Sequence, residues 1–322
     1  MVKKSIFLFL LACLYLTGCS SAPDHNVHSD PAASSESGFT ITDFANQSHS
    51  FNEVPERIAA LSNGEMDIIY ALGAELVGRP NSSGPPSIEE ATEVTQVGST
   101  HEVDLERITY VQPDVVLGHS QMNLKDVPTI ESLGAKMVLT QAQSIEDIKQ
   151  QIHLFGEMLQ KEEQAEQLIT NMEEHISNLS DTLPEQKTRV LLIYGAPGTY
   201  MAALPNSLSG NLLEVAGGEN IASDFQQLDA YPQYAQLNTE RIIEAEPEYI
   251  LLMSHGNSDE VKAGFLKEME QNAAWNNLDA VKEGRIDVLP SDLFGSNPGT
   301  KVTEALDILV EIFRSIESDE SP

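Results

Sequence analysis

Histidine is the residue type in this sequence best suited to bind a transition metal, because neutral imidazole is a good donor to such metals. The 322-residue chain has eight histidines but only two cysteines, Cys13 and Cys19. Both cysteines lie near the start of the chain, so we expect neither a cysteine metal site nor an intrachain disulfide in the folded part. Any metal must therefore be held by other side chains.

His101 and His255 are the histidines best placed for such a role, because each follows a predicted strand or loop and precedes a predicted helix. Ligands bind at that edge of the sheet in doubly wound α/β proteins. The two residues fall in different halves of the chain, so they could hold one ligand from two sides. His119, which follows another predicted strand, is the reserve donor. Met122 is a further candidate, although methionine at a sheet edge usually packs.

The elements that must position these residues alternate between strand and helix in the first half of the chain. Predicted strands are Arg57–Leu61, Leu76–Gly78, Asp114–Leu117 and Lys136–Leu139, and predicted helices are Glu65–Leu72, Leu105–Val111 and Val127–Leu133. This alternation predicts a parallel sheet with helices on both faces.

The second half repeats the pattern and predicts a second, similar lobe. Its predicted strands are Arg189–Tyr194, Tyr249–Met253 and Ile286–Leu289, and its predicted helices are Gly210–Ala216, Glu240–Ala245, Val261–Gln271 and Thr300–Ile316. We therefore expect two α/β lobes, at residues 39–143 and 187–316.

Residues 144–180 between the lobes are rich in Glu, Gln, Lys, Ile and Leu and have no proline. Ser144 followed by Asp147 predicts a helix N-cap. Apolar residues at helical spacing continue to about Lys161, which predicts a helix of about 25 Å. A second helix is expected from about Glu162. These helices would connect the lobes stiffly.

The first 18 residues have the pattern of a secretory signal peptide. Two lysines precede an apolar run over residues 6–16, which is too short for a membrane-spanning helix of about 20 residues. The segment Leu16–Cys19 resembles a bacterial lipobox, in which Cys19 is lipidated and becomes the mature N-terminus. Residues 19–38 have almost no large apolar side chain and are expected to form a disordered tether.

The net charge and the missing motifs exclude several classes of function. The formal charge is −32, and loss of a leader with two lysines and no acid makes it −34, which argues against nucleic acid and against electrostatic capture by anionic lipid. The chain has no Gly-x-Gly-x-x-Gly after its first strand, no phosphate-binding Gly-x-x-x-x-Gly-Lys loop and no Gly-x-Ser-x-Gly elbow. We therefore expect no enzymatic activity.

Several motifs together resemble one family, the helix-linked substrate-binding proteins of siderophore, cobalamin and heme importers. They are Arg57–Ser62, Tyr70–Ala74, Leu76–Gly78, Val97–Gly98, Val103–Ile108, Gln112–Val116 and Gly217–Ile221. The resemblance covers roughly residues 39–316. It implies a class III clamshell, in which two Rossmann-like lobes are joined by a single long connecting helix. It also implies an ABC permease and its ATPase as partners, and a monomer.

Four motifs of the second lobe resemble the heme-binding lipoproteins of the iron-regulated surface determinant system of Gram-positive bacteria. They are Gly195–Tyr200, Gly217–Asn220, Ser254–Gly256 with Asp259–Val261, and Asp292–Gly295. The resemblance implies heme as the transported ligand, with His255 as one axial ligand of the iron. The methionine that is the second ligand in that group falls at His101 here, so we expect two histidine ligands. It also implies lipid anchoring outside the cytoplasmic membrane and a heme-donating surface protein upstream.

The same resemblance suggests further site residues. Tyr200 could contact the porphyrin or pack in the core, and backbone N–H groups at Gly198 or near Asn63–Gly64 could bind the propionates. Arg79 is the one arginine considered for that role. The acids that meet the permease in this family match Asp67 and Glu219, and Glu65 replaces Asp67 if the register is shifted by two.

A ferric-siderophore or corrinoid binding protein of the same family is the alternative. Such a protein would hold its ligand with arginines, tyrosines or tryptophans. The chain has only 18 lysines and arginines and a single tryptophan, Trp275, which favours heme.

Overall fold

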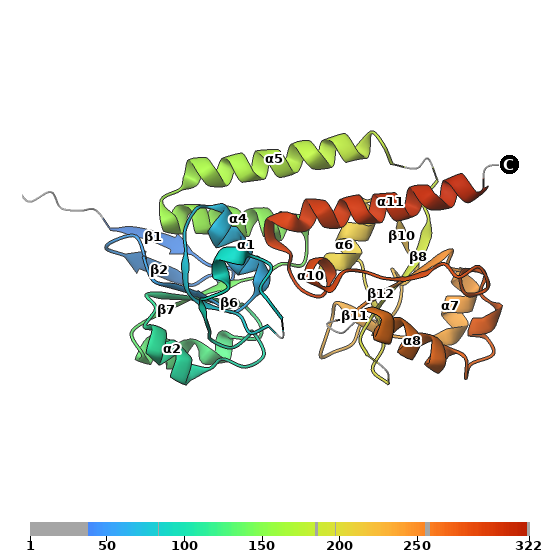
Figure 1. The fold of residues 1–322 in the computed structure, drawn as a ribbon, viewed down its shortest axis with the longest axis horizontal. Helices are drawn as coiled ribbons and strands as arrows, with labels where there is room; N and C mark the ends of the chain where they lie inside the picture. The colour runs from blue at the N-terminus through green and yellow to red at the C-terminus, as the bar shows by residue number, and fades with distance from the viewer. Residues whose placement is uncertain (1–37, 83, 184–185, 197, 255–257, 321–322) are drawn as a thin grey trace, which may run out of the picture. The chain divides into compact units, whose positions relative to one another are not determined.

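The first sheet, which includes β6 and β7 (Figure 1), has five parallel strands in the order β5-β4-β3-β6-β7. This computed structural model describes residues 38–320 except 83, 184–185, 197 and 255–257. The strands of the first sheet are β3 Ile58–Ala60, β4 Leu76–Arg79, β5 Thr95–Gln96, β6 Val115–His119 and β7 Lys136–Thr140. They are connected through α1 Asn63–Ala71, α2 Leu105–Val111, α3 Val127–Ser132 and the 3-10 turns η1 Glu89–Ala91 and η2 Leu124–Asp126. Strands β3 and β6 are buried almost throughout, as expected for parallel strands covered on both faces. The predicted parallel sheet is confirmed.

A two-stranded antiparallel hairpin, which we did not predict, precedes this sheet. It pairs β1 Phe39–Thr42 with β2 Ser48–Phe51. Phe44 in the turn donates its N–H to the Leu139 carbonyl at 3.0 Å, and Phe39 stacks on Phe51 with ring centroids 5.3 Å apart. The hairpin thereby adds to the β7 side of the first lobe.

The second sheet has six strands and is only partly parallel. Its order is β11-β9-β8-β12-β13, and β10 also pairs with β8. The strands are β8 Arg189–Tyr194, β9 Met201–Ala203, β10 Glu219–Asn220, β11 Tyr234–Gln236, β12 Tyr249–Met253 and β13 Ile286–Val288. Strand β9 runs antiparallel to both β8 and β11, so the second sheet differs from the first at that edge.

The helices of the second lobe match most of the predicted segments. They are α6 Leu208–Val215, α7 Thr239–Ala245, α8 Ser258–Met269, α9 Asp279–Lys282, α10 Ser291–Phe294 and α11 Val302–Glu320, with the 3-10 turns η3 Trp275–Asn277 and η4 Gly299–Lys301. The short η3, α9 and α10 were not predicted.

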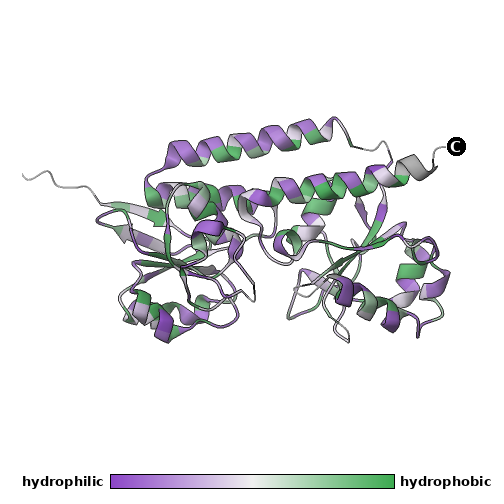
Figure 2. Ribbon diagram, viewed as in Figure 1, coloured by the Kyte–Doolittle hydropathy of each residue, from purple (hydrophilic) through white to green (hydrophobic). Residues whose placement is uncertain are grey.

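Two helices lead from the first sheet to the second, α4 Ile145–Leu159 and α5 Glu162–Ser180. The Ser144 hydroxyl accepts the N–H of Asp147 at 3.1 Å, which confirms the predicted N-cap. Gln160 adopts φ +51 and ends α4, so the chain reverses there and α5 packs on α4. Helix α5 buries little beyond Ala165 and Met172, and Figure 2 shows it as largely hydrophilic.

One hydrophobic cluster runs without interruption through both sheets. It includes Leu117 of β6, Phe155 of α4, Leu192 of β8 and Phe313 of α11. Helix α11 also contacts α5 and α6, and η4 contacts α1. The lobes therefore share a continuous core along the helices that join them, which favours a stiff connection.

Candidate ligand-binding site

His119 is the last residue of β6, at the carboxyl edge of the first sheet. Its backbone N–H donates to Asn123 Oδ1 at 2.9 Å, within a turn that ends the strand. Asn123 is completely buried, and its Nδ2 donates to the carbonyl of Thr100 and to Asp126 Oδ2, each at 3.0 Å. Asn123 thus ties the turn of His119 to the loop of His101, a role that we did not predict.

His101 lies in a narrow loop that closes back on itself. Ser99 donates its N–H to the Glu102 carbonyl at 2.8 Å, and Gly98 bridges to Val103. Gly98 has φ +109, and a Cβ there would lie 2.4 Å from the Glu102 carbonyl oxygen, so the loop requires glycine. The side chain of His101 is exposed at the tip.

The two imidazoles lie close enough to influence each other. Burial lowers the pKa of His119, and the charge of a protonated His101 lowers it further. His119 Nδ1 accepts the N–H of Gln121 at 3.2 Å, so the proton of its neutral ring lies on Nε2. An Nε2 that carries a proton cannot donate to a metal, whereas no hydrogen bond holds the ring of His101 in the described part of the chain.

His255 lies outside the described residues. Strand β12 brings the chain to Met253 and the buried Ser254 at the carboxyl edge of the second sheet. The N–H of Gly195, at the end of β8, donates to the Met253 carbonyl at 3.1 Å. The carboxyl ends of β8 and β12, where we expected the ligand to bind, are therefore adjacent.

The two residues predicted to contact the porphyrin from this lobe are both engaged within the protein. Gly198 donates its N–H to Glu268 Oε2 at 2.9 Å, so a propionate would have to replace this carboxylate, and the role of Gly198 stays a prediction. The Tyr200 ring packs edge-on against Phe265, with centroids 5.3 Å apart, and its hydroxyl is buried without a partner in the described residues. Tyr200 therefore takes the packing role of the two that were considered.

We did not predict a pair of stacked tyrosines in the second sheet. Tyr194 ends β8, Tyr234 begins β11, and their rings stack with centroids 5.2 Å apart. Burial raises the pKa of Tyr234 to about 12, with a smaller contribution from Tyr194. The pairing of β11 with β9 brings the two rings together, and no local pattern signals it.

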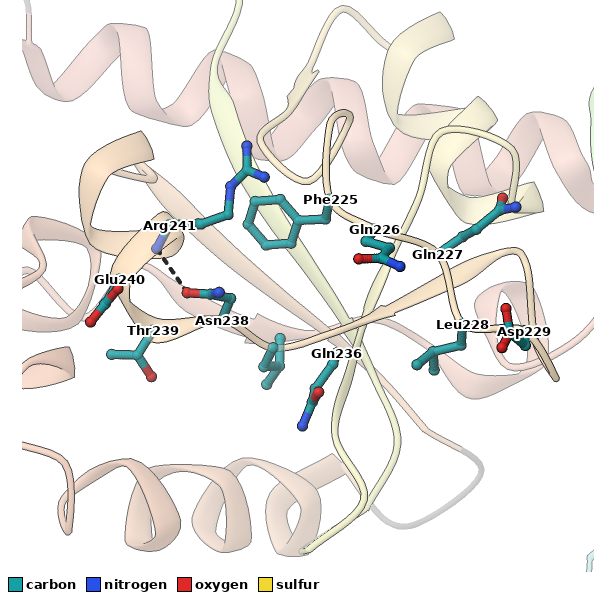
Figure 3. Close-up of a pocket in the computed structure, with 11 residues that line it drawn as sticks. Phe225, Gln226, Gln227, Leu228, Asp229, Gln236, Asn238, Thr239, Glu240 and Arg241 are labelled. Atoms are coloured by element: carbon teal, nitrogen blue, oxygen red, sulfur yellow. Dashed lines mark hydrogen bonds between the residues drawn. The ribbon is translucent and has the colours of Figure 1, made fainter.

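A cavity with a volume of about 750 Å³ lies in the second lobe (Figure 3). Its wall comes from the loop Phe225–Asp229, strand β11 and the start of α7. Figure 3 shows the Arg241 guanidinium beside the Phe225 ring, 5.2 Å from its centroid. Most of the lining side chains are polar, which does not suit a porphyrin.

The acids assigned to the permease contact differ in accessibility. Glu219 is exposed on β10, as a docking residue must be. Asp67 is only 5% exposed and accepts hydrogen bonds from Thr300, so the assignment of Asp67 as a surface docking acid is wrong for this structure. Glu65 is 1% exposed and accepts the Thr140 hydroxyl at 2.7 Å, so it cannot replace Asp67.

The family follows from the comparisons with known proteins. The model of the periplasmic binding protein family matches residues 58–293, and the chain belongs to this family. It is 26% identical over 314 residues to the high-affinity heme uptake system protein IsdE of Staphylococcus aureus strain MRSA252, covering 97% of this chain and 98% of the relative.

Solved structures agree with the family. An ABC transporter substrate-binding protein from Listeria monocytogenes EGD-e matches with a TM-score of 0.71 and 29% identity, covering 81% of this chain and 98% of that chain. S. aureus IsdE complexed with heme matches with a TM-score of 0.70 and 26% identity, covering 80% and 98%. The siderophore binding protein BauB, with 16% identity, a TM-score of 0.68 and coverage of 86% and 98%, shares the fold alone.

These findings define the class of the protein. It is a substrate-binding protein of the ABC importer family with a class III clamshell fold, and not an enzyme. Among the described residues, no helix has the length and apolar content needed to cross a membrane.

Proposed function

We propose that this protein is the extracytoplasmic heme-binding subunit of an ABC importer, and that it delivers heme to the permease for iron acquisition. The observation that carries the proposal is the exposed imidazole of His101 at the carboxyl edge of the first sheet, on a loop fixed by Gly98 and Asn123. Similarity over nearly the whole chain to a protein named for heme uptake supports it.

A site with two histidines is better suited to heme than to a bare metal ion, because the porphyrin already supplies four nitrogens to the iron. Each face of the ring leaves one axial position, which a neutral imidazole can fill. We assign these positions to His101 from the first lobe and His255 from the second. His119 is the weaker donor, because its Nδ1 accepts the Gln121 N–H and places the ring proton on Nε2.

Ferric siderophore is the second candidate ligand for a binding protein of this family. The stacked rings of Tyr194 and Tyr234 would suit such a complex. The two ligands differ in their optical spectra, so one titration separates them.

We also propose a lipid anchor at Cys19, which lies outside the described residues. Its basis is the Leu16–Cys19 match to a lipobox. Cys19→Ala should release the protein from the membrane fraction while the purified protein still binds its ligand. An N-terminus of the mature protein well beyond Cys19, without lipid, would contradict the anchor.

A hemin titration followed in the Soret and visible bands tests the proposed function. The wild type should give a low-spin, six-coordinate spectrum, and His101→Ala and His255→Ala should each give a five-coordinate or water-bound iron. His255→Ala should be the more damaging change. His119→Ala is the matched control from the same edge and should keep the wild-type spectrum.

Each outcome decides a separate claim. Unchanged spectra in both His101→Ala and His255→Ala would exclude these histidines as ligands. A wild type that produces no Soret shift with hemin would exclude heme and favour the siderophore.

A further inference from the structure

Arg79, the last residue of β4, is a buried cation without a counterion. It is 6% exposed and is the only arginine or lysine among the buried residues that the structure describes. Four other arginines form ion pairs with carboxylates: Arg107, Arg189, Arg241 and Arg285. Arg79 forms none with any described residue. Because burial of an unpaired charge is costly, the site favours an anion.

The unused donors of Arg79 form one edge of its guanidinium. Nη1 donates to the Pro80 carbonyl and to Ser82 Oγ, each at 3.1 Å. Nε is buried with no hydrogen-bond partner, and the structure records no bond of Nη2 within the described part of the chain. The N–H groups of Nε and Nη2 point the same way, and such a fork binds the two oxygens of a carboxylate with parallel hydrogen bonds.

Arg79 lies at the same sheet edge as the proposed iron ligand. The segment after it is bonded to the segment that enters the His101 loop: Asn81 donates its N–H to the Gly98 carbonyl at 2.7 Å, and Gly98 donates back to Asn81 Oδ1 at 3.1 Å. Ser82 donates its N–H to Gln96 Oε1 at 3.1 Å. The two loops therefore form one bonded unit that carries the buried guanidinium of Arg79 and the exposed imidazole of His101.

We propose that Arg79 binds a carboxylate of the transported ligand through its Nε–Nη2 edge. For heme this group is a propionate, and in that form the inference rests on the proposed function. The carboxylate supplies the counterion that the protein itself lacks at this position, and it fixes the rotation of the porphyrin about the iron axis. Arg79 is thus a residue that determines specificity for ligands with an acid group.

The test compares hemin with hemin dimethyl ester, in which both propionates are esterified. Arg79→Gln should weaken binding of hemin by roughly 10- to 100-fold, the range expected for a charge-assisted hydrogen bond. It should change binding of the diester by no more than about threefold. Arg107→Gln, which removes an exposed positive charge from α2, is the matched control and should leave both affinities unchanged.

The outcomes separate the ligand contact from a purely structural role. Equal hemin affinity in wild type and Arg79→Gln would overturn the proposal, and so would an equal loss for hemin and the diester, which would indicate damage to the loop. If the wild type binds neither form, the heme assignment fails, and ferric citrate becomes the probe. Weaker ferric citrate binding by Arg79→Gln alone would still support the carboxylate site, whereas equal binding or none would overturn it.

Discussion

Asp67 of α1 accepts two hydrogen bonds from Thr300, which lies 233 positions further along the chain. The Thr300 N–H and hydroxyl approach Asp67 Oδ2 at 2.6 and 2.7 Å. Gly299 next to it has φ +64, and a Cβ there would lie 2.5 Å from the same oxygen. A buried acid in the first lobe is therefore held by the turn that begins α11.

Thr300→Val should lower the free energy of unfolding by about 1–2 kcal/mol, because it removes the hydroxyl donor and keeps the side-chain shape. Urea denaturation measures the change. Thr300→Ser, which keeps the hydroxyl, is the control and should lose less. In a double-mutant cycle with Asp67→Asn, the valine change should cost less than in the wild type. An equal cost in both backgrounds would show that the hydroxyl does not act through Asp67.

Asp43 should make the stability of the protein sensitive to acid. Its Oδ1 accepts the N–H groups of Ala45 and Gln47, each at 2.9 Å, and its Oδ2 accepts His49 Nε2 at 2.9 Å and the Leu139 N–H at 3.1 Å. Burial alone would raise the pKa of Asp43, but the bonds from His49, Gln47 and Leu139 outweigh burial and lower it. The stabilisation is thus present above the unfolded-state pKa of about 3.9 and is lost as pH falls through the lowered folded-state value.

Asp43→Asn should therefore cost about 2 kcal/mol near pH 6 and weaken the dependence of stability on pH below about 4. Thermal unfolding at several pH values measures both effects. Asp114→Asn is the matched control, since Asp114 accepts the N–H groups of Glu56 and Arg57 but is exposed. Parallel acid profiles for Asp43→Asn and the wild type would refute this role of Asp43.

The elements that the sequence predicted well are those whose signals are local. Helix α4 begins at its predicted cap, Ser144, and buries the apolar residues that recur at helical spacing, such as Ile148 and Phe155. Strands β6 and β12 are short apolar runs that end close to their predicted limits. Such features depend on neighbours within a few residues, so one sequence suffices to find them.

The errors concern contacts between distant segments. Asp67 was assigned to the permease because it matches a docking acid of the family, and nothing near it in the sequence indicates that Thr300 covers it. Strands β9 and β11 have three residues each, too few for a period-two pattern, and they form only because they pair with each other and with β8. The bond from the Gly198 N–H to Glu268 was missed because nothing local indicates it.

Glu219→Lys should strongly reduce import by the intact transporter and leave ligand binding by the isolated protein unchanged. The reason is that Glu219 is exposed on β10, at the amino edge of the second sheet opposite the ligand edge, so reversal of its charge would affect a partner rather than the ligand. Uptake by cells and ligand titration of the purified protein measure the two properties. Glu214→Lys is the control, an equal charge change at an exposed position of the neighbouring α6. If both variants import normally, Glu219 is an ordinary surface acid.

His101→Gln should raise the pKa of His119 towards its ordinary value. Burial is the larger cause of the lowered pKa of His119, and the substitution does not change it. The substitution removes only the repulsion from His101, so the rise in the pKa should be partial. NMR titration of the imidazole resonances in the ligand-free protein measures it. His153→Gln, an exposed histidine on α4, is the control and should leave His119 unchanged. An unaltered pKa of His119 in His101→Gln would show that the two rings do not approach each other in solution.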